Sequence, residues 1–228
     1  MHLKIKELMV VLTCLMPSLG LAQQLTKQAF YFGGMGGLAT LSGDANAVIT
    51  ANSASTSSYD PSNGGAASAF IGVHVFDYLS LQTDYVWNRN DVVLVSSVNG
   101  SAGSSFYRLP ETVTQNAFLG NVLIYFRKRE SRIRPYLSEG AGGGLIHSRL
   151  SGGGIIRGVP ALPPASSDHA SIGVRTSVGL DVRLGTSWYL RYSFGETITR
   201  NTFVDQLSPP KHRIAKNFQS LFGIYFRL

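Results

Sequence analysis

Apolar residues alternate with small or polar ones throughout the segment Ile172-Gly-Val-Arg-Thr-Ser-Val-Gly-Leu-Asp-Val-Arg-Leu184. Its even-numbered positions carry isoleucine, valine and leucine apart from Thr176, and its odd-numbered positions carry glycine, serine and charged residues. Since successive side chains of a strand point to opposite faces, this period of two predicts a strand with one apolar and one polar face.

The same alternation recurs in seven other segments of the chain. They are residues 30–38, 70–76, 79–88, 117–126, 136–146, 188–194 and 218–228. Their length suits tilted strands that cross a bilayer, which need roughly 9 to 11 residues each. The sequence therefore predicts eight strands.

The links between these segments are alternately short and long. The short links are residues 77–78, 127–133 and 185–187, and the long ones are residues 42–65, 89–111, 147–170 and 195–213. The long links are rich in serine, alanine, asparagine, glycine and proline, so we expect solvated, mobile loops. Tight periplasmic turns that alternate with long extracellular loops are typical of an up-and-down transmembrane barrel.

The distribution of charge separates a membrane barrel from a soluble one. Charged residues make up only 14% of the 228 residues, against about 25% in an ordinary soluble domain. In the predicted strands they gather on one face, which holds Asp84, Arg175, Asp181, Arg183 and Arg191. A soluble barrel such as a lipocalin would carry its charges outside, whereas an apolar face without charge suits lipid. We therefore predict an all-β fold, an eight-stranded antiparallel up-and-down transmembrane β-barrel, with the lipocalin-like barrel as the less favoured alternative.

The N-terminus has the three zones of a secretory signal peptide. Lys4 and Lys6 precede the apolar stretch Leu8 to Met16, and the small residues Gly20 and Ala22 come just before a cleavage site after Ala22. The apolar stretch is too short to span a bilayer as a helix. We predict a signal peptide at residues 1–22 and a barrel domain at residues 23–228.

Four segments carry a resemblance to a known family, namely residues 29–37, 70–82, 134–144 and 177–182. They resemble the strand signatures of the small outer membrane β-barrel family, which includes the OmpA membrane anchor, OmpX and the opacity proteins. The resemblance implies a location in a Gram-negative-type outer membrane, among its lipids and lipopolysaccharide. The ending Gly223 to Leu228 is similar to the C-terminal strand by which the barrel assembly machinery recognises such proteins, although it ends in leucine instead of an aromatic residue.

A polar network is expected inside the barrel. Asp181 and Arg191 should face each other across the tight hairpin centred near Thr186, because a buried unpaired charge is costly. Asp84, Arg175 and Arg183 should extend the network. Such a network forms either an ion path or a packed polar plug, and the narrow interior of eight strands favours the plug.

The sequence also predicts the positions of one acidic and two aromatic side chains. Strict alternation gives Glu139 the face of Leu137 and Ala141, yet we expect its carboxylate to point inward through a bulge or a reversed face. Trp87 should lie at the outer end of its strand and Trp188 at the inner end of its own, one indole in each interfacial belt.

Catalytic and metal sites are not indicated. His74, His147, His169 and His212 lack metal-ligand spacing, and no cofactor motif is present. Some lipid A deacylases are eight-stranded barrels with serine and histidine on the outer wall, but His147 and Ser148 are adjacent and should point to opposite faces. The basic stretch of residues 127–134 suits anionic lipid headgroups or solvent, and nucleic acid is not an expected partner.

The sequence thus favours an outer membrane barrel with a structural or surface-interaction role through its extracellular loops. A narrow porin-like channel is the alternative, and a lipid A modifying enzyme is the third choice. The ligand of the loops is unknown.

Overall fold

The computed structural model describes residues 29–43, 46–50, 52–60, 62–101, 103–150, 155–157, 164–201 and 213–228. The expected signal peptide at residues 1–22 lies outside these ranges. No helix in the described part of the chain is long and apolar enough to cross a membrane.

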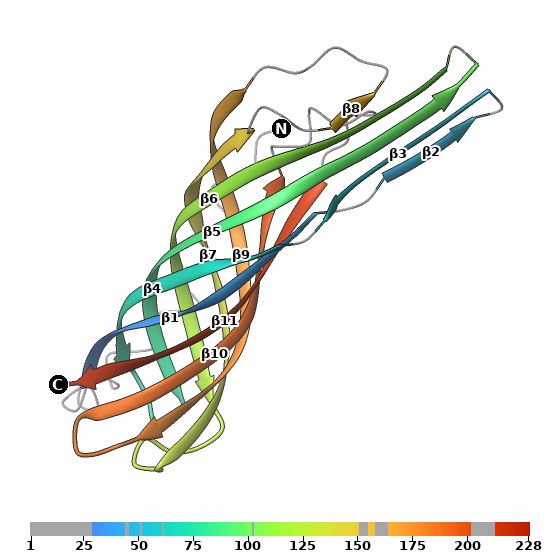
Figure 1. The fold of residues 1–228 in the computed structure, drawn as a ribbon. Coiled ribbons are helices and arrows are strands. Elements are labelled where there is room, and N and C mark those ends of the chain that lie inside the picture. The colour runs from blue at the N-terminus through green and yellow to red at the C-terminus, as the bar shows by residue number, and fades with distance from the viewer. Residues whose placement is uncertain are drawn as a thin grey trace, which may run out of the picture.

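Eight strands form a closed antiparallel ring (Figure 1). They are β1 (Ala29–Gly43), β4 (Ser62–His74), β5 (Leu79–Gly100), β6 (Gly103–Tyr125), β7 (Ile133–Leu150), β9 (Ala165–Arg183), β10 (Trp188–Asn201) and β11 (Arg213–Arg227). Each strand pairs with its neighbours in the chain, and β1 pairs with β11 to close the barrel. The predicted all-β up-and-down barrel is confirmed.

The two ends of the barrel differ. We call the end with the short connections at residues 75–78, 126–132 and 184–187 the turn end, and the opposite end the loop end. Beyond the ring, β2 (Asn46–Thr50) pairs with β3 (Ser53–Asp60), β3 pairs with β5, and β8 (Ile155–Arg157) pairs with β6, all towards the loop end.

The prediction of a loop over residues 89–111 is wrong. β5 and β6 run on as one long hairpin that projects past the rest of the barrel, with Gly103 at a positive φ of 126° beside its tip (Figure 1). The reason is packing, because Val92, Leu94 and Leu109 in this stretch are buried and keep the two strands paired. The other three long links also begin or end in strand.

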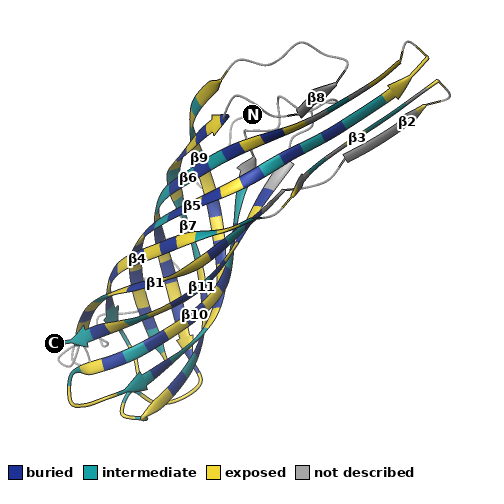
Figure 2. Cartoon of the chain, viewed as in Figure 1, coloured by how far each residue is buried: buried dark blue, intermediate teal, exposed yellow. Residues whose placement is uncertain are grey.

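Burial alternates along every strand of the ring (Figure 2). The outward positions carry large apolar side chains that are about half exposed or more, including Phe30, Phe32, Ile71, Phe118, Ile124, Leu145, Ile172, Val178, Phe222 and Ile224. The inward positions carry most of the buried polar and charged side chains. We call the outward apolar positions the apolar band, and its exposure matches a wall that faces lipid.

Two glycines make room for aromatic rings in the lumen. A Cβ at Gly179 would overlap the ring of Tyr136, and a Cβ at Gly72 would overlap the ring of Tyr31. Both tyrosines are buried, so these glycines allow large side chains to fill a narrow interior.

Candidate functional site

The lumen is built around the ion pair of Asp181 and Arg191. They are Cα partners on β9 and β10, and both point inward with no exposed surface. The guanidinium donates from Nε to Oδ1 at 2.7 Å and from Nη2 to Oδ2 at 2.8 Å. This two-point contact is the strong geometry for an arginine and a carboxylate. The structure brings the two residues together as the sequence predicted.

Hydroxyl and amide groups complete the surroundings of this pair. Tyr125 and Tyr225 donate to Asp181 Oδ2 at 3.0 and 2.9 Å, and Arg191 Nη1 donates to Gln82 Oε1 at 2.6 Å. The guanidinium also lies 4.6 Å from the ring centre of Tyr225 and 4.8 Å from that of Phe70. Charge, hydrogen bonds and aromatic faces thus offset the cost of burying the two ions.

A second pair, Asp84 and Arg175, lies beside the first. Arg175 Nη1 is 3.7 Å from Asp84 Oδ2, and both side chains are buried. Gln82 Nε2 donates to Asp84 Oδ1 at 2.5 Å, and Asn121 Nδ2 donates to Oδ2 at 3.0 Å. Gln82 therefore contacts both ion pairs and joins them into one network.

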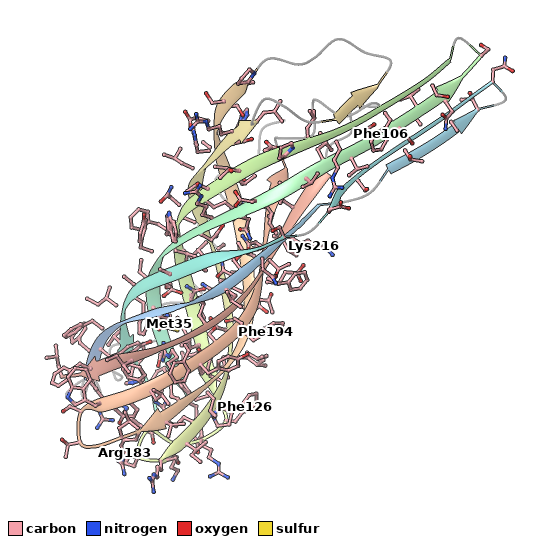
Figure 3. All side chains as sticks on the ribbon, viewed as in Figure 1. Met35, Phe106, Phe126, Arg183, Phe194 and Lys216 are labelled. Carbon is pink, nitrogen blue, oxygen red and sulfur yellow. The ribbon has the colours of Figure 1, made fainter. Side chains whose placement is uncertain are left out.

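Arg183 does not extend this network. It is half-buried at the turn end of β9 (Figure 3). With Arg132 and residues 184–186 it lines a hollow there. Its side chain has no hydrogen bond or ion pair with the Asp181 network among the described residues. The prediction failed because Arg183 lies at the last residue of its strand, where the barrel opens to solvent.

Glu139 points outward, which corrects the prediction that it points inward. The alternation of β7 is unbroken on both sides of it, since Ser138 is buried and Leu137 is exposed. Thr176, its Cα partner on β9, donates from Oγ1 to Glu139 Oε2 at 2.9 Å. A neighbouring hydroxyl on the outer wall therefore contacts the carboxylate, without a bulge.

Sequence reasoning missed Arg134 as a lumen residue. It is 1% exposed, its guanidinium lies 3.7 Å from the ring centre of Tyr125, and Nη2 donates to the carbonyl oxygen of Asp77 at 3.0 Å. Its place in the basic run of residues 127–134 suggested a solvated turn. It is two residues from Tyr136 and four from Ser138, however, and this spacing puts the three side chains on the same face of a strand. His74, also fully buried, contacts Ser80 through Nδ1 at 2.6 Å.

Above the ion pairs, towards the loop end, the lumen holds a layer of amides and hydroxyls. Asn217 Nδ2 donates to Asn88 Oδ1 at 3.0 Å and to Gln115 Oε1 at 2.9 Å. A cavity of about 20 Å³ lies beside these residues, which is space for a single water-sized molecule. Thr197 and Gln219 also line it, and each has a side-chain oxygen without a protein partner in the described structure.

At the loop end, buried apolar side chains close the lumen. We call this cluster the apolar layer, and it consists of Leu41, Val92, Leu94, Leu109, Val113, Ile146, Leu150 and Ala215. It brings together residues of β1, β5, β6, β7 and β11. Apolar side chains that meet from facing walls, such as Leu41 of β1 and Ile146 of β7, exclude water from the space between them.

Glu111 and Ser148 are two of the buried polar residues that lie beside the apolar layer. The Ser148 hydroxyl donates to Glu111 Oε1, and both side chains point inward. Glu111 lies on the part of β6 beyond the apolar band, and burial raises the pKa of its carboxyl to about 7. A carboxyl in this setting is favoured in its neutral form.

His147 and Ser148 point to opposite faces, as expected from their adjacency. His147 lies on the outer wall, where Nδ1 is 2.6 Å from Asp168 Oδ1, while Ser148 is in the lumen. Within the described ranges no group of three or more His, Cys, Asp or Glu side chains is arranged to hold a metal ion, and His212 lies outside those ranges.

The two tryptophans have different surroundings. Trp188 begins β10 at the turn end and is 51% exposed, with its ring edge against Phe226. Trp87 is half-buried, and β5 continues from it to Gly100, so it does not lie at the outer end of its strand. The strand is longer than expected because of the projecting hairpin. The interfacial position of the two indoles remains a prediction.

A family model described as an outer membrane protein beta-barrel domain matches residues 10–214. The chain belongs to this family. This outer membrane barrel therefore resides in the outer membrane, with its apolar band towards membrane lipid, and the lipocalin-like alternative is set aside.

Several solved outer membrane proteins are similar to this outer membrane barrel. Neisserial surface protein A has 15% identity and a TM-score of 0.48, over 88% of this chain and 99% of that one. Ail of Yersinia pestis, in complex with a heparin analogue, has 8% identity and a TM-score of 0.46, over 87% and 99%. OprG of Pseudomonas aeruginosa has 11% identity and a TM-score of 0.40, over 88% and 95%. The comparison with curated proteins found no match.

Proposed function

We propose that this outer membrane barrel acts as a structural and surface-interaction protein through the strands and loops at its loop end. The observation that supports this most is the filled lumen. A fully buried ion pair fills it near the turn end, and the apolar layer crosses it nearer the loop end. A lumen without a continuous polar path conducts poorly, which leaves the outside of the protein for function.

The projecting hairpin of β5 and β6 supports a role at the cell surface. With β3 and β8 paired to its flanks, it forms a sheet that rises beyond the apolar band (Figure 1). In an up-and-down outer membrane barrel the long connections lie outside the cell. The sheet therefore presents backbone and side chains to extracellular partners.

Shortening this hairpin tests the surface role. Residues 95–106 would be replaced by a two-residue turn, which keeps Val92, Leu94 and Leu109 of the apolar layer. Whole cells with the full-length or the shortened protein would be applied to an array of immobilised glycans and matrix proteins. We expect adherence only with the full-length protein, while both proteins keep a heat-modifiable barrel on gels. Equal adherence by both would contradict a surface role for the hairpin.

A narrow channel is the second candidate function, and the amide layer favours it. Asn217, Gln115 and Gln219 line the lumen with groups that could solvate an ion, beside the small cavity. Conduction of ions would require the side chains of the ion pair and of the apolar layer to move away from one another and open a path through the lumen. Loss of the Asp181 and Arg191 pair would then raise conductance and leave stability unchanged.

Two partners belong to the same proposal. The exposed Phe222 and Ile224 on β11, and Leu228 directly after it, support recognition of this strand by the barrel assembly machinery. The lipid of the outer leaflet, lipopolysaccharide, surrounds the loop-end half of the apolar band. A catalytic role is not part of the proposal, because His147 and Ser148 lie on opposite faces of the wall.

A further inference from the structure

Polar and charged side chains gather on the outer wall just beyond the apolar band. Cross-strand pairing places Arg89, Thr114, His147 and Asp168 in one row across β5, β6, β7 and β9. Asp91, Thr112, Arg149 and Ser166 form a second row, one step further towards the loop end. The arginines, acids and His147 are exposed, and the two threonines are half-buried.

A hollow of about 530 Å³ lies over this patch. The side chains that line it on the outer wall are Arg89, Thr112, Thr114, His147 and Arg149, with Leu150 and Pro164 at its border. We call this hollow the outer-wall pocket. It offers two guanidinium groups and the hydroxyl of Thr114 within one depression, a donor set that suits a phosphate group.

The acids beside the pocket are already engaged. Asp91 accepts a hydrogen bond from Thr112 Oγ1 at 2.7 Å, and Asp168 contacts His147 at 2.6 Å. Neither Arg89 nor Arg149 has a hydrogen bond or ion pair with any other described residue. Within the described part of the chain, the guanidinium groups of Arg89 and Arg149 therefore have no protein partner, while Asp91 and Asp168 in the same rows are hydrogen-bonded to Thr112 and His147.

The position of the pocket along the barrel selects the ligand. From Ile133 to Leu145 the outward face of β7 is apolar except at Glu139. With about 3.3 Å per residue and a tilt of about 40°, this part of the strand extends roughly 30 Å along the barrel axis. That length equals the thickness of a hydrocarbon core of about 30 Å. His147 and Arg149 follow directly at the loop end, at the depth of lipid headgroups.

The wall beneath the pocket leaves space for hydrocarbon chains. Gly143 lies between Phe118 and Ile172 in the register of β6, β7 and β9, and these two side chains are 64% and 80% exposed. Ala141, two residues further towards the turn end, is also small and exposed. A lipid chain can thus lie along β7 between large flanking side chains, with its headgroup in the pocket.

We propose that the outer-wall pocket binds the phosphate groups of the phosphorylated glycolipid of the outer leaflet, the lipid A part of lipopolysaccharide. Arg89 and Arg149 pair with the phosphates, Thr114 donates from its hydroxyl, and the glycolipid's acyl chains lie over Gly143 and Ala141. This site rests on the proposed contact with lipopolysaccharide and adds the residues that make it specific.

Binding of bis-phosphorylated lipid A to the purified full-length barrel in mild detergent tests the site. Native mass spectrometry counts the bound lipid, and Trp87, two residues from Arg89, reports binding by fluorescence. The test variant is Arg89→Gln with Arg149→Gln. The matched control is Arg132→Gln with Arg183→Gln, which removes two arginines from the hollow at the turn end. EDTA is present in every sample, so that bridging by divalent cations does not contribute.

We expect the test variant to bind lipid A roughly 100-fold more weakly than the wild type, since each charge-assisted contact contributes about tenfold. The control should bind as the wild type does, monophosphorylated lipid A should bind more weakly, and inorganic phosphate should not compete at millimolar concentration. Equal binding by wild type and test variant, or equal loss in the control, would overturn the site. Competition by inorganic phosphate would assign the pocket to free phosphate instead. Absence of lipid A from the wild type would overturn the proposed contact with lipopolysaccharide itself.

Discussion

Arg191 and Asp181 face each other across β10 and β9, and two hydrogen bonds of 2.7 and 2.8 Å join the guanidinium to the carboxylate. Neither residue has any exposed surface. Removing one member of such a pair costs much free energy, because the remaining buried ion loses its counter-ion. The pair also binds side chains from β5, β6 and β11, so it ties distant walls of the barrel together.

Removal of one member of the pair should therefore destabilise the barrel strongly. We expect Asp181→Asn or Arg191→Gln to lower the free energy of unfolding by about 3 to 5 kcal/mol, and the double substitution to lower it by less than the sum. Urea unfolding followed by gel mobility measures this. Asp91→Asn, an exposed acid on the outer wall, is the control and should have little effect. Additive losses would show that the two side chains do not act as a pair.

Gly179 should not tolerate a side chain. A Cβ there would overlap the ring of Tyr136, which is buried against Tyr125 with ring centres 5.5 Å apart. We expect Gly179→Ala to cost about 1 to 3 kcal/mol in the free energy of unfolding, as overpacking does. Gly185→Ala is the matched control, because no atom lies within 4 Å of its added Cβ. Equal stability of the two variants would mean that the Tyr136 ring can move aside.

Glu111 should make the stability of the barrel depend on pH. Burial raises the pKa of its carboxyl from 4.5 to about 7, so the folded state holds a proton that the unfolded chain releases earlier. The resulting stabilisation is full below pH 4.5 and is lost as the pH rises through about 7, with a total of about 3 kcal/mol. Melting temperatures of wild type and Glu111→Gln, measured from pH 4 to 9, should diverge over this window. Parallel curves would contradict the burial of an ionisable group at this position.

The outward direction of Glu139 can be tested by chemical labelling. Residues 138 and 139 alternate between lumen and outer wall, with Ser138 buried and Glu139 exposed. In liposomes, a lipid-soluble maleimide should label Glu139→Cys rapidly and Ser138→Cys slowly. The chain has one cysteine of its own, Cys14, which lies in the predicted signal peptide. The reverse order of labelling would restore the inward position that we expected for Glu139 against the alternation of its strand.

The strands of the ring were predictable because the sequence of each strand alternates between apolar and polar or small residues. In β9 the charges Arg175 and Asp181 alternate with valines, and the structure separates them as expected. The extension of β5 past Arg89 was missed, because Val92 to Val95 is apolar at every position and so lost the period of two. In such a stretch, only pairing with β6 determines which residues are buried.

The predicted direction of a side chain was wrong where a general expectation was preferred to the alternation of the strand. Glu139 was expected in the lumen through a bulge or a reversed face, and Arg134 was grouped with the basic stretch of residues 127–134. The alternation along β7 gives the correct direction for both side chains. Other features depend on contacts between distant strands. The apolar layer unites Leu41, Leu94 and Ile146 from three walls, and no local sequence signal joins them.

Single-channel recording of the wild-type barrel in planar bilayers tests the central claim, that the lumen is sealed by the buried ion pair and the apolar layer. The account predicts no stable open level from a protein preparation whose heat-modifiability on gels shows it to be folded. It also predicts that Asp181→Asn lowers stability before it produces any current. A steady conductance of the wild type, raised further by Asp181→Asn at unchanged stability, would contradict the sealed lumen and establish the channel.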